Sequence, residues 1–443
     1  MRIVATCCAL VTVLGCGRRG YDVDPEASVL SGPTLFYSEG IGDLMTISHG
    51  VDGWSEPVQI GSAASLVGWM RTVRAASGEI LVAVHAGDQL VVHRNAGGGW
   101  QVNLEVRTAA TDPDRRPFDI GVEKLTGQPL LVYVEPAGAL TARTRTGGAW
   151  SEPSPVPSPA TGVIDWVELS ARPGSDELTA LVADENLTLS ASVWDGEGWT
   201  INTQLADALR IREWQNFTGI YERVSGDYLA LWGQLVPDLD GIAFATRQAG
   251  ADSFSPTMTD SDVFRPVGMP RLASEPASDL VALAYVEYET NPGAAQDFVV
   301  ATWTGSSWID SLVVDSDIGG SGYEPNPGAL PCAVSWIGTT ATAIATYSNE
   351  DDGVIGLDFA SWSPTSNWVV EPTATSVATG DEETSFVTMN NPDDDTLLLI
   401  MSDEAGFLRA KRFADSAWSD ADGGGPLLGP LRVSGMPYGA IVP

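Results

Sequence analysis

A hairpin that ends in an aromatic residue recurs about every fifty residues along this chain. Neighbouring members of the series are 46 to 60 residues apart. The aromatic positions are Trp54, Trp100, Trp150, Trp199, Phe254, Trp308, Trp368 and Trp418. Self-similarity at this period is typical of radial or stacked repeats, whose units share one continuous core. The spacing therefore predicts eight units in one domain, with the aromatic residue packed structurally between neighbouring units.

Each unit is predicted to contain four strands. About twenty residues before each aromatic lies a run rich in Val, Leu, Ile and Tyr, such as ILVAVH at 80–85. Runs of this kind, bounded by turn residues, are typical of interior strands. One further strand precedes each run and two follow it, joined by turns that contain Gly, Asp or Asn. The pattern predicts an all-β propeller of four-stranded antiparallel blades, with eight blades expected and seven as the alternative.

The first and last units are complementary. Only a polar segment precedes TLFYS at 34–38, so the first unit lacks its opening strand. The segment LRVSGMPYGAIV at 431–442 is left over after the last aromatic. Because an unpaired strand edge exposes backbone hydrogen-bonding groups, we predict that the C-terminal strand completes the first blade. Residues 31–443 are then a single propeller domain.

The amino terminus has the features of an export signal. A basic start precedes the apolar run IVATCCALVTVLG, which is too short for a membrane span and typical of a signal peptide. The sequence VLGC ending at Cys16 resembles a bacterial lipobox. We predict a lipoprotein signal peptide over 1–15, lipidation of Cys16 and a flexible tether over 16–30, with an ordinary signal peptide as the alternative. The protein is then extracytoplasmic, anchored at the outer membrane or cell surface through the lipid alone.

Composition restricts the partners and the chemistry. The formal net charge is −35, which disfavours nucleic acid and anionic lipid surfaces as partners. Only three His are present, without metal-protease spacing, and there is no Gly-x-Ser-x-Gly nucleophile motif. Once the amino terminus is removed, Cys332 is the single Cys of the propeller and is interpreted as a small buried hydrophobe. We expect a monomer without a cofactor.

Two groups of residues are candidate ligand sites. Arg71, Arg116, Arg212 and Arg265 lie at or near the starts of predicted innermost strands, which would converge on one rim of a central channel. Such a rim would bind a carboxylate or sulfate bidentately, whereas scattered pairing with surface acids is the structural alternative. Asp315 and Asp317 offer closely spaced oxygens for a structural calcium ion, with a solvated turn as the alternative.

The stretch from Ser192 to Trp199, Ser-Val-Trp-Asp-Gly-Glu-Gly-Trp, resembles the Asp-box hairpin of the sialidase-like bacterial β-propellers. The resemblance implies a propeller fold, and no catalytic residue is carried over from it. We predict that the propeller binds a glycan or an envelope protein without catalysis. The alternatives are a sialidase-type glycoside hydrolase acting at the channel mouth and a structural platform in an envelope complex.

Overall fold

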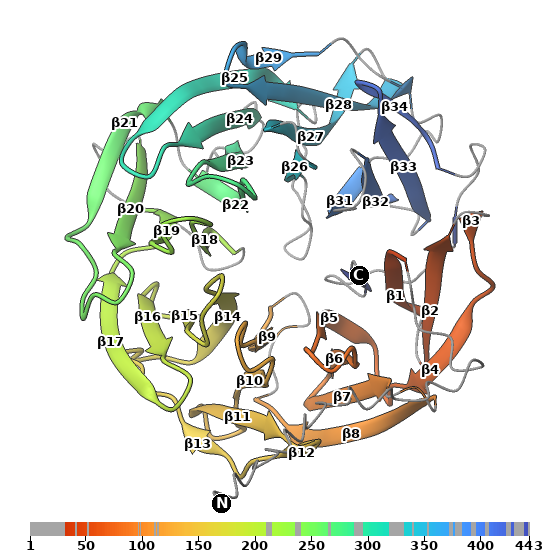
Figure 1. Cartoon of the computed structure of the whole chain (residues 1–443), viewed down its shortest axis with the longest axis vertical. Coiled ribbons are helices and arrows are strands. Elements are labelled where there is room, and N and C mark those ends of the chain that lie inside the picture. The colour runs from red at the N-terminus through yellow and green to blue at the C-terminus, as the bar shows by residue number, and fades with distance from the viewer. Residues whose placement is uncertain are drawn as a thin grey trace, which may run out of the picture.

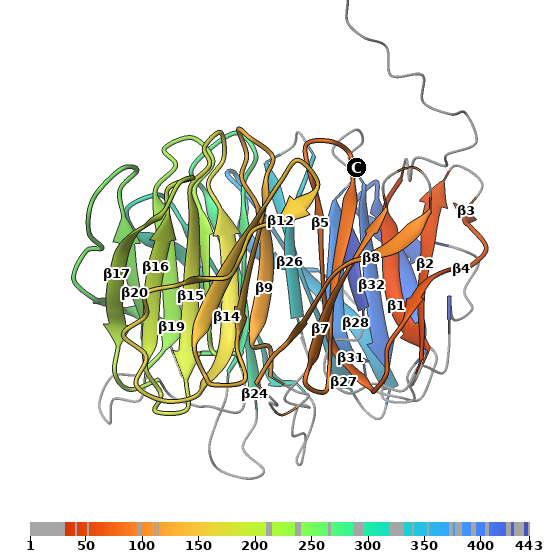
Figure 2. The ribbon, with the colours of Figure 1, turned by 90° about the horizontal axis from the view of Figure 1, so that it is seen from below.

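The computed structural model contains eight antiparallel β-sheets arranged radially around one axis (Figures 1 and 2). It describes residues 32–441 except 40–41, 51–52, 96, 98, 110–111, 113–114, 210–214, 235–240, 265–266, 288–295, 319–331, 339–340, 352–353, 372–374, 377–382, 391–395, 404–406, 422–426 and 429–437. The predicted signal peptide, Cys16 and the tether lie outside the described residues. Within the described part there is no helix, and hence no helix that could cross a membrane.

The blades follow one another around the ring in chain order, and the strands of each are named from the innermost outward (Figure 1). Blade 1 holds β35 (Tyr438–Ile441), β1 (Thr34–Glu39), β2 (Asp43–Gly50), β3 (Gly53–Trp54) and β4 (Val58–Ser62). Blade 2 holds β5 (Val67–Arg74), β6 (Ile80–Ala86), β7 (Gln89–Asn95) and β8 (Trp100–Arg107). Blade 3 holds β9 (Phe118–Val122), β10 (Pro129–Val134), β11 (Leu140–Thr146), β12 (Ala149–Trp150) and β13 (Ser154–Pro155). Blade 4 holds β14 (Ile164–Ala171), β15 (Leu178–Asp184), β16 (Leu189–Trp194) and β17 (Trp199–Ala206).

The second half of the ring repeats this plan. Blade 5 holds β18 (Phe217–Tyr221), β19 (Tyr228–Gly233), β20 (Gly241–Arg247) and β21 (Met258–Phe264). Blade 6 holds β22 (Val267–Ser274), β23 (Val281–Glu287), β24 (Gln296–Trp303) and β25 (Trp308–Ile318). Blade 7 holds β26 (Cys332–Ile337), β27 (Thr342–Asp351), β28 (Val354–Ser363), β29 (Asn367–Val370) and β30 (Thr375–Ser376). Blade 8 holds β31 (Glu383–Asn390), β32 (Leu397–Asp403), β33 (Leu408–Ala414) and β34 (Ala417–Asp420).

The ring is closed by the carboxyl terminus, as the sequence predicts. Strand β35 pairs antiparallel with β1, from Thr34 opposite Ile441 to Tyr37 opposite Tyr438. The innermost strands contact one another in a complete circle, because β35 touches both β5 and β31 (Figure 1). Both the eight-blade count and the closure by the last strand are therefore confirmed.

The core lies between the blades. Every residue of the second strands β6, β10, β15, β19 and β23 is buried. A strand covered on both faces by neighbouring blades has no solvent side, which explains why these runs are continuously apolar instead of alternating.

The repeated aromatic stands within a few residues of the start of the outermost strand of each blade. Trp100 packs edge-on against Phe36 of the preceding blade, with ring centroids 5.5 Å apart. The indole Nε1 of Trp150 donates a hydrogen bond of 2.8 Å to Asn103 Oδ1, also in the preceding blade. Phe254 instead packs against Tyr228 of its own blade, at 6.1 Å. These contacts join a hairpin either to its neighbour or to its own sheet.

Candidate functional site

A cavity of about 550 Å³ lies along the central axis, lined by the innermost strands of blades 2 to 7 and the residues that flank them. We call it the central channel. Among its described lining residues Glu168 is the only carboxylate, whereas five are basic. The basic residues are Arg71, Arg116, Lys124, Arg223 and Arg271. The lining is therefore mainly basic although the chain as a whole has a net charge of −35.

Hydrogen bonds between blades give the direction of the innermost strands. The amide of Val167 donates to the Arg116 carbonyl at 2.9 Å, and the amide of Leu169 donates to Asp119 Oδ2 at 2.9 Å. Residue numbers rise together in both strands, so β9 and β14 are parallel. Arg116 therefore belongs to the end of the channel where innermost strands begin, the entry end. Lys124 follows the end of β9 and belongs to the opposite, exit end.

Three polar residues occupy the same level inside the channel. Arg71, Glu168 and Arg271 are each the fifth residue of an eight-residue innermost strand. A β-bulge interrupts each of these strands before that residue. In β22 the bulge includes Met269, whose φ is 46°. Because a bulge re-aims the side chains that follow it, this repeated irregularity places the three groups at the channel.

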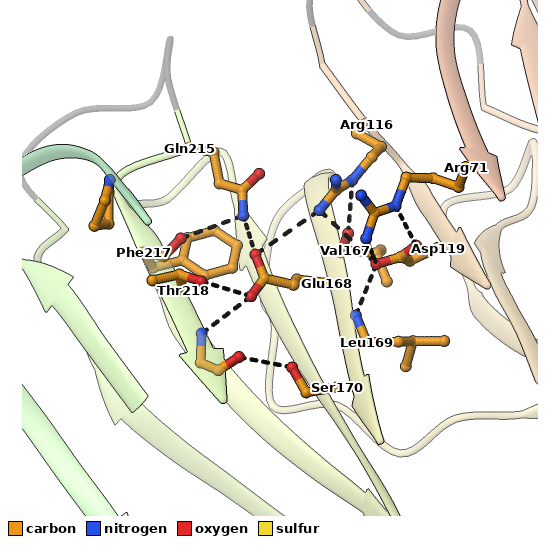
Figure 3. A network of polar contacts seen from close by, with 12 residues as sticks. Arg71, Arg116, Asp119, Val167, Glu168, Leu169, Ser170, Gln215, Phe217 and Thr218 are labelled. Atoms are coloured by element: carbon orange, nitrogen blue, oxygen red, sulfur yellow. Dashed lines mark hydrogen bonds and ion pairs between the residues drawn. The ribbon is translucent and has the colours of Figure 1, made fainter. Parts of the chain in front are cut away.

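Asp119 is the anionic centre of the network in Figure 3. Its fully buried carboxylate accepts hydrogen bonds from Arg71 Nε at 2.8 Å and Nη2 at 3.3 Å. It also accepts the backbone amides of Ile120 and Leu169, at 2.8 and 2.9 Å. Burial opposes ionisation, but the charges of Arg71 and Arg116 outweigh it and hold the pKa of Asp119 below its usual range. Arg71 is thus engaged in an internal ion pair.

Glu168 is held just as firmly on the other side of Arg116. Its carboxylate accepts hydrogen bonds from Thr218 Oγ1 at 2.9 Å, from the Gly219 amide at 3.0 Å and from the side-chain amide of Gln215 (Figure 3). Arg116 Nη2 lies 3.9 Å from both Glu168 Oε2 and Asp119 Oδ2, beyond hydrogen-bonding distance. Burial and the charge of Arg71 lower the pKa of Arg116 to about 10. Arg116 therefore keeps one buried donor without a partner.

Arg271 faces this network from blade 6 and is the least satisfied of the channel cations. Its Nη1 donates to the Pro270 carbonyl at 3.0 Å, whereas its Nε and Nη2 are buried without a hydrogen-bond partner. Nε and one Nη form the edge of a guanidinium that binds a carboxylate through two parallel hydrogen bonds. Burial lowers the pKa of Arg271. Such an edge is chemically suited to an anionic ligand.

The exit end carries a second pair of cations. Lys124 lies in the turn EKLTG at 123–127 and Arg223 in the turn ERVSG at 222–226, and both residues are exposed. Burial of part of the Lys124 side chain and the positive charge of Arg223 lower the pKa of Lys124. The two cations therefore repel each other at the same opening of the channel.

The structure places two of the four predicted arginines in the channel. Arg71 lies at mid-strand instead of at a rim, because β5 begins four residues before it, at Val67, and Arg116 lies two residues before the start of β9. Arg212 and Arg265 lie outside the described residues. The sequence also places Arg271, like Arg265, near the start of a predicted innermost strand, but it did not indicate the other charged residues of the lining, Glu168, Lys124 and Arg223. The repeated turns EKLTG and ERVSG, two blades apart, are the sequence signal that points to the last two.

The predicted calcium residues remain a prediction. Asp315 accepts a hydrogen bond of 3.3 Å from the Tyr347 hydroxyl, and the side chain of Asp317 lies outside the described residues. Among the described residues no group of three or more His, Cys, Asp or Glu could hold a metal ion. Cys332 is fully buried and free, at the entry end of the channel. Burial raises the pKa of its thiol to about 12 although Arg271 acts in the opposite direction.

Comparison with known proteins finds distant likeness of fold and no family. No protein-family model and no curated protein matches this chain. A lectin from Burkholderia pseudomallei is 15% identical, covering 81% of this chain and 98% of the lectin, with a TM-score of 0.49. A polysaccharide lyase is 8% identical over 88% of this chain and 99% of the lyase, with a TM-score of 0.47. A lectin from Aleuria aurantia is 12% identical over 69% and 94%, with a TM-score of 0.37. The sialidase-like relationship is not confirmed by any family match.

Proposed function

We propose that this propeller binds an acidic glycan in its central channel, without catalysis, at the cell envelope to which Cys16 anchors it. The observation that carries the proposal is Arg271, whose Nε and Nη2 are buried beside the channel without a hydrogen-bond partner. Leaving a buried donor unsatisfied costs about 1–3 kcal/mol, and more for a charged group. If the Arg271 side chain turns this edge toward the cavity that it lines, a carboxylate or sulfate bound there removes that cost and relieves the repulsion among the channel cations.

A sugar is favoured over a simple anion by hydroxyl groups that line the same cavity as Arg271. Ser170 Oγ donates to the Gly219 carbonyl and Ser274 Oγ to the Tyr221 carbonyl, both at 2.7 Å. A hydroxyl that already donates its proton in a hydrogen bond can still accept a hydrogen bond through its oxygen lone pairs. The channel therefore presents acceptors for the hydroxyl donors of a sugar next to donors for its acidic group.

The proposal of binding without catalysis is supported by how the acidic and phenolic groups are used. Glycoside hydrolysis generally needs two carboxyl groups that flank the scissile bond, and Glu168 alone lines the described part of the channel. Its oxygens are already engaged by blade 5. The Tyr221 hydroxyl is hydrogen-bonded to Thr179 and Glu177, and burial together with the Glu177 charge raises the pKa of Tyr221. A buried, protonated phenol is a poor nucleophile.

The test is the binding of galacturonic acid, N-acetylneuraminic acid and acidic polysaccharides, measured calorimetrically against neutral sugars. Loss of one or two charge-assisted hydrogen bonds predicts that Arg271→Gln weakens binding about 10- to 100-fold. Arg271→Lys keeps the charge but not the two-donor edge, and we expect its affinity for acidic sugars to lie between that of the wild type and that of Arg271→Gln. Arg107→Gln is the matched control, because Arg107 is exposed on β8 and pairs with Asp88 away from the channel.

Thermal melts of each variant establish that it is folded. Equal affinity of wild type and Arg271→Gln for every acidic ligand, or a preference for neutral sugars, refutes the proposal. Release of reducing sugar by the wild type favours the sialidase-type hydrolase instead. Specific binding of an envelope protein without any glycan favours the platform.

A further inference from the structure

The exit end of the channel is built from two copies of one turn. In blades 3 and 5 the innermost strand is followed by an acidic residue, a cation, an aliphatic residue, a hydroxyl residue and Gly, as EKLTG at 123–127 and ERVSG at 222–226. Lys124 and Arg223 line the channel, and the aliphatic residues next to them are exposed. Leu125 is 70% and Val224 67% exposed, which is more than packing of the fold requires.

Each turn is held by two carboxylates. Asp176 accepts the backbone amides of Leu125 and Thr126, both at 2.8 Å. Glu123 accepts the hydroxyl of Thr126 and, at 2.8 Å, the indole Nε1 of Trp194 in the next blade. The turn is therefore fixed by side chains of its own blade and its neighbour before any ligand arrives.

The second turn repeats these contacts one for one. Asp279 accepts the amides of Val224 and Ser225, both at 2.8 Å. Glu222 accepts the Ser225 hydroxyl at 2.6 Å and the Nε1 of Trp303 at 2.7 Å. The glutamate of each turn is occupied by hydrogen bonds within the fold, whereas the cation and the aliphatic side chain of each turn face solvent. Because the turn is already ordered, binding of a ligand costs less conformational entropy.

We infer that Lys124 and Arg223, with Leu125 and Val224 beside them, form a second anion subsite, and that the ligand is a linear chain of acidic sugars spanning the channel from Arg271 to the exit end. Arg271, Lys124 and Arg223 line one continuous cavity, and Leu125 and Val224 are the residues that follow the two exit-end cations in the chain. The cation binds the acidic group of a sugar, and the neighbouring aliphatic side chain packs against the C–H face of the sugar ring. This inference rests on the proposed function, because it assumes that acidic sugars bind at Arg271.

The test is the dependence of affinity on ligand length. Galacturonic acid, its linear dimer and its linear hexamer are titrated into the wild type, with maltohexaose as the uncharged control. If two subsites are filled at once, the hexamer binds at least about tenfold more tightly than the monomer, because its second contact is intramolecular. Two exposed cations together predict that Lys124→Gln/Arg223→Gln weakens hexamer binding about tenfold and leaves monomer binding unchanged. Leu125→Ser/Val224→Ser reduces the same length dependence.

The outcomes separate the inference from the function on which it rests. If Arg271→Gln weakens all the uronides but affinity is the same for monomer and hexamer, the second subsite is wrong and the proposed function stands. The subsite is equally overturned if the hexamer binds tightly and the Lys124→Gln/Arg223→Gln protein binds it as the wild type does. If no uronide binds the wild type, the proposed function fails and the inference fails with it. The exposed positions of Lys124 and Arg223 keep the double variant folded, which a thermal melt verifies.

Discussion

Replacing Asp119 by Asn tests the electrostatic core of the channel. The carboxylate of Asp119 accepts two hydrogen bonds from Arg71 and two from backbone amides, and it is fully buried. An amide of the same shape keeps one acceptor oxygen but turns an NH₂ group toward donors. It also removes the negative charge that faces Arg71 and Arg116. The folded protein must then keep the two positively charged guanidinium groups of Arg71 and Arg116 close together without the negative charge that offsets their repulsion.

Removing one partner of a buried ion pair costs about 3–5 kcal/mol. The Arg71 side chain is 37% exposed, so water replaces part of the lost interaction, and we expect the lower end, about 3 kcal/mol. With an unfolding entropy of about 2.1 cal/mol/K per residue over about 400 residues, this lowers the midpoint of thermal unfolding by about 4 °C. The double variant Arg71→Gln/Asp119→Asn should be less destabilised than the sum of the single variants, by about 2 kcal/mol.

The assay is urea and thermal unfolding of the four proteins in this cycle, between pH 7 and pH 3. The folded-state pKa of Asp119 is depressed, so its stabilisation is fully present above the unfolded value near 3.8 and is lost as pH falls through the lower folded value. The difference between wild type and Asp119→Asn should therefore be constant from pH 7 to pH 5 and shrink below about pH 4. A cost below about 1 kcal/mol at pH 7, or a coupling energy of zero, would refute the ion-pair reasoning.

Two further predictions concern the closure of the ring and its thiol. Deleting residues 438–443 removes β35 and leaves the edge of β1 unpaired. The loss of about four backbone hydrogen bonds at roughly 1 kcal/mol each predicts that the midpoint of thermal unfolding falls by about 5 °C. We also expect proteolysis within blade 1. An unchanged melt would mean that β35 contributes nothing to closure. Because the pKa of Cys332 is raised to about 12, alkylation by iodoacetamide at pH 8 should be about a thousandfold slower in the native protein than in urea, as mass spectrometry can measure. Equal rates would contradict burial of the thiol.

The blade plan was predictable because it is local. A continuous apolar run followed by a Gly-rich hairpin and an aromatic residue specifies one blade, and eight such runs specify the ring. The pairing of β35 with β1 joins the two ends of the chain and is not local, but the strand count predicts it, because the first unit lacks a strand and the last has one to spare. Strand pairing within a blade depends only on neighbours in the chain, and the last strand had one open edge left to satisfy.

The site was predictable only in part, because the channel is assembled from residues that lie about fifty positions apart. The sequence indicated Arg71 and Arg116, but the ion pair of Arg71 with Asp119 arises only when β5 and β9 lie side by side. Arg71 and Arg271 reach the channel through bulges that period-two alternation does not reveal.

By itself, then, the sequence determined the repeat, the blade and the closure of the ring, since each follows from hydrophobic pattern and strand count. Only the tertiary structure decided which cations are neutralised and which keep free donors. Arg71 is paired and Arg271 is not, although both occupy the fifth position of equivalent strands. The reason is that a guanidinium N–H is satisfied only by an acceptor within hydrogen-bonding distance, and that distance is set by the packing of neighbouring blades.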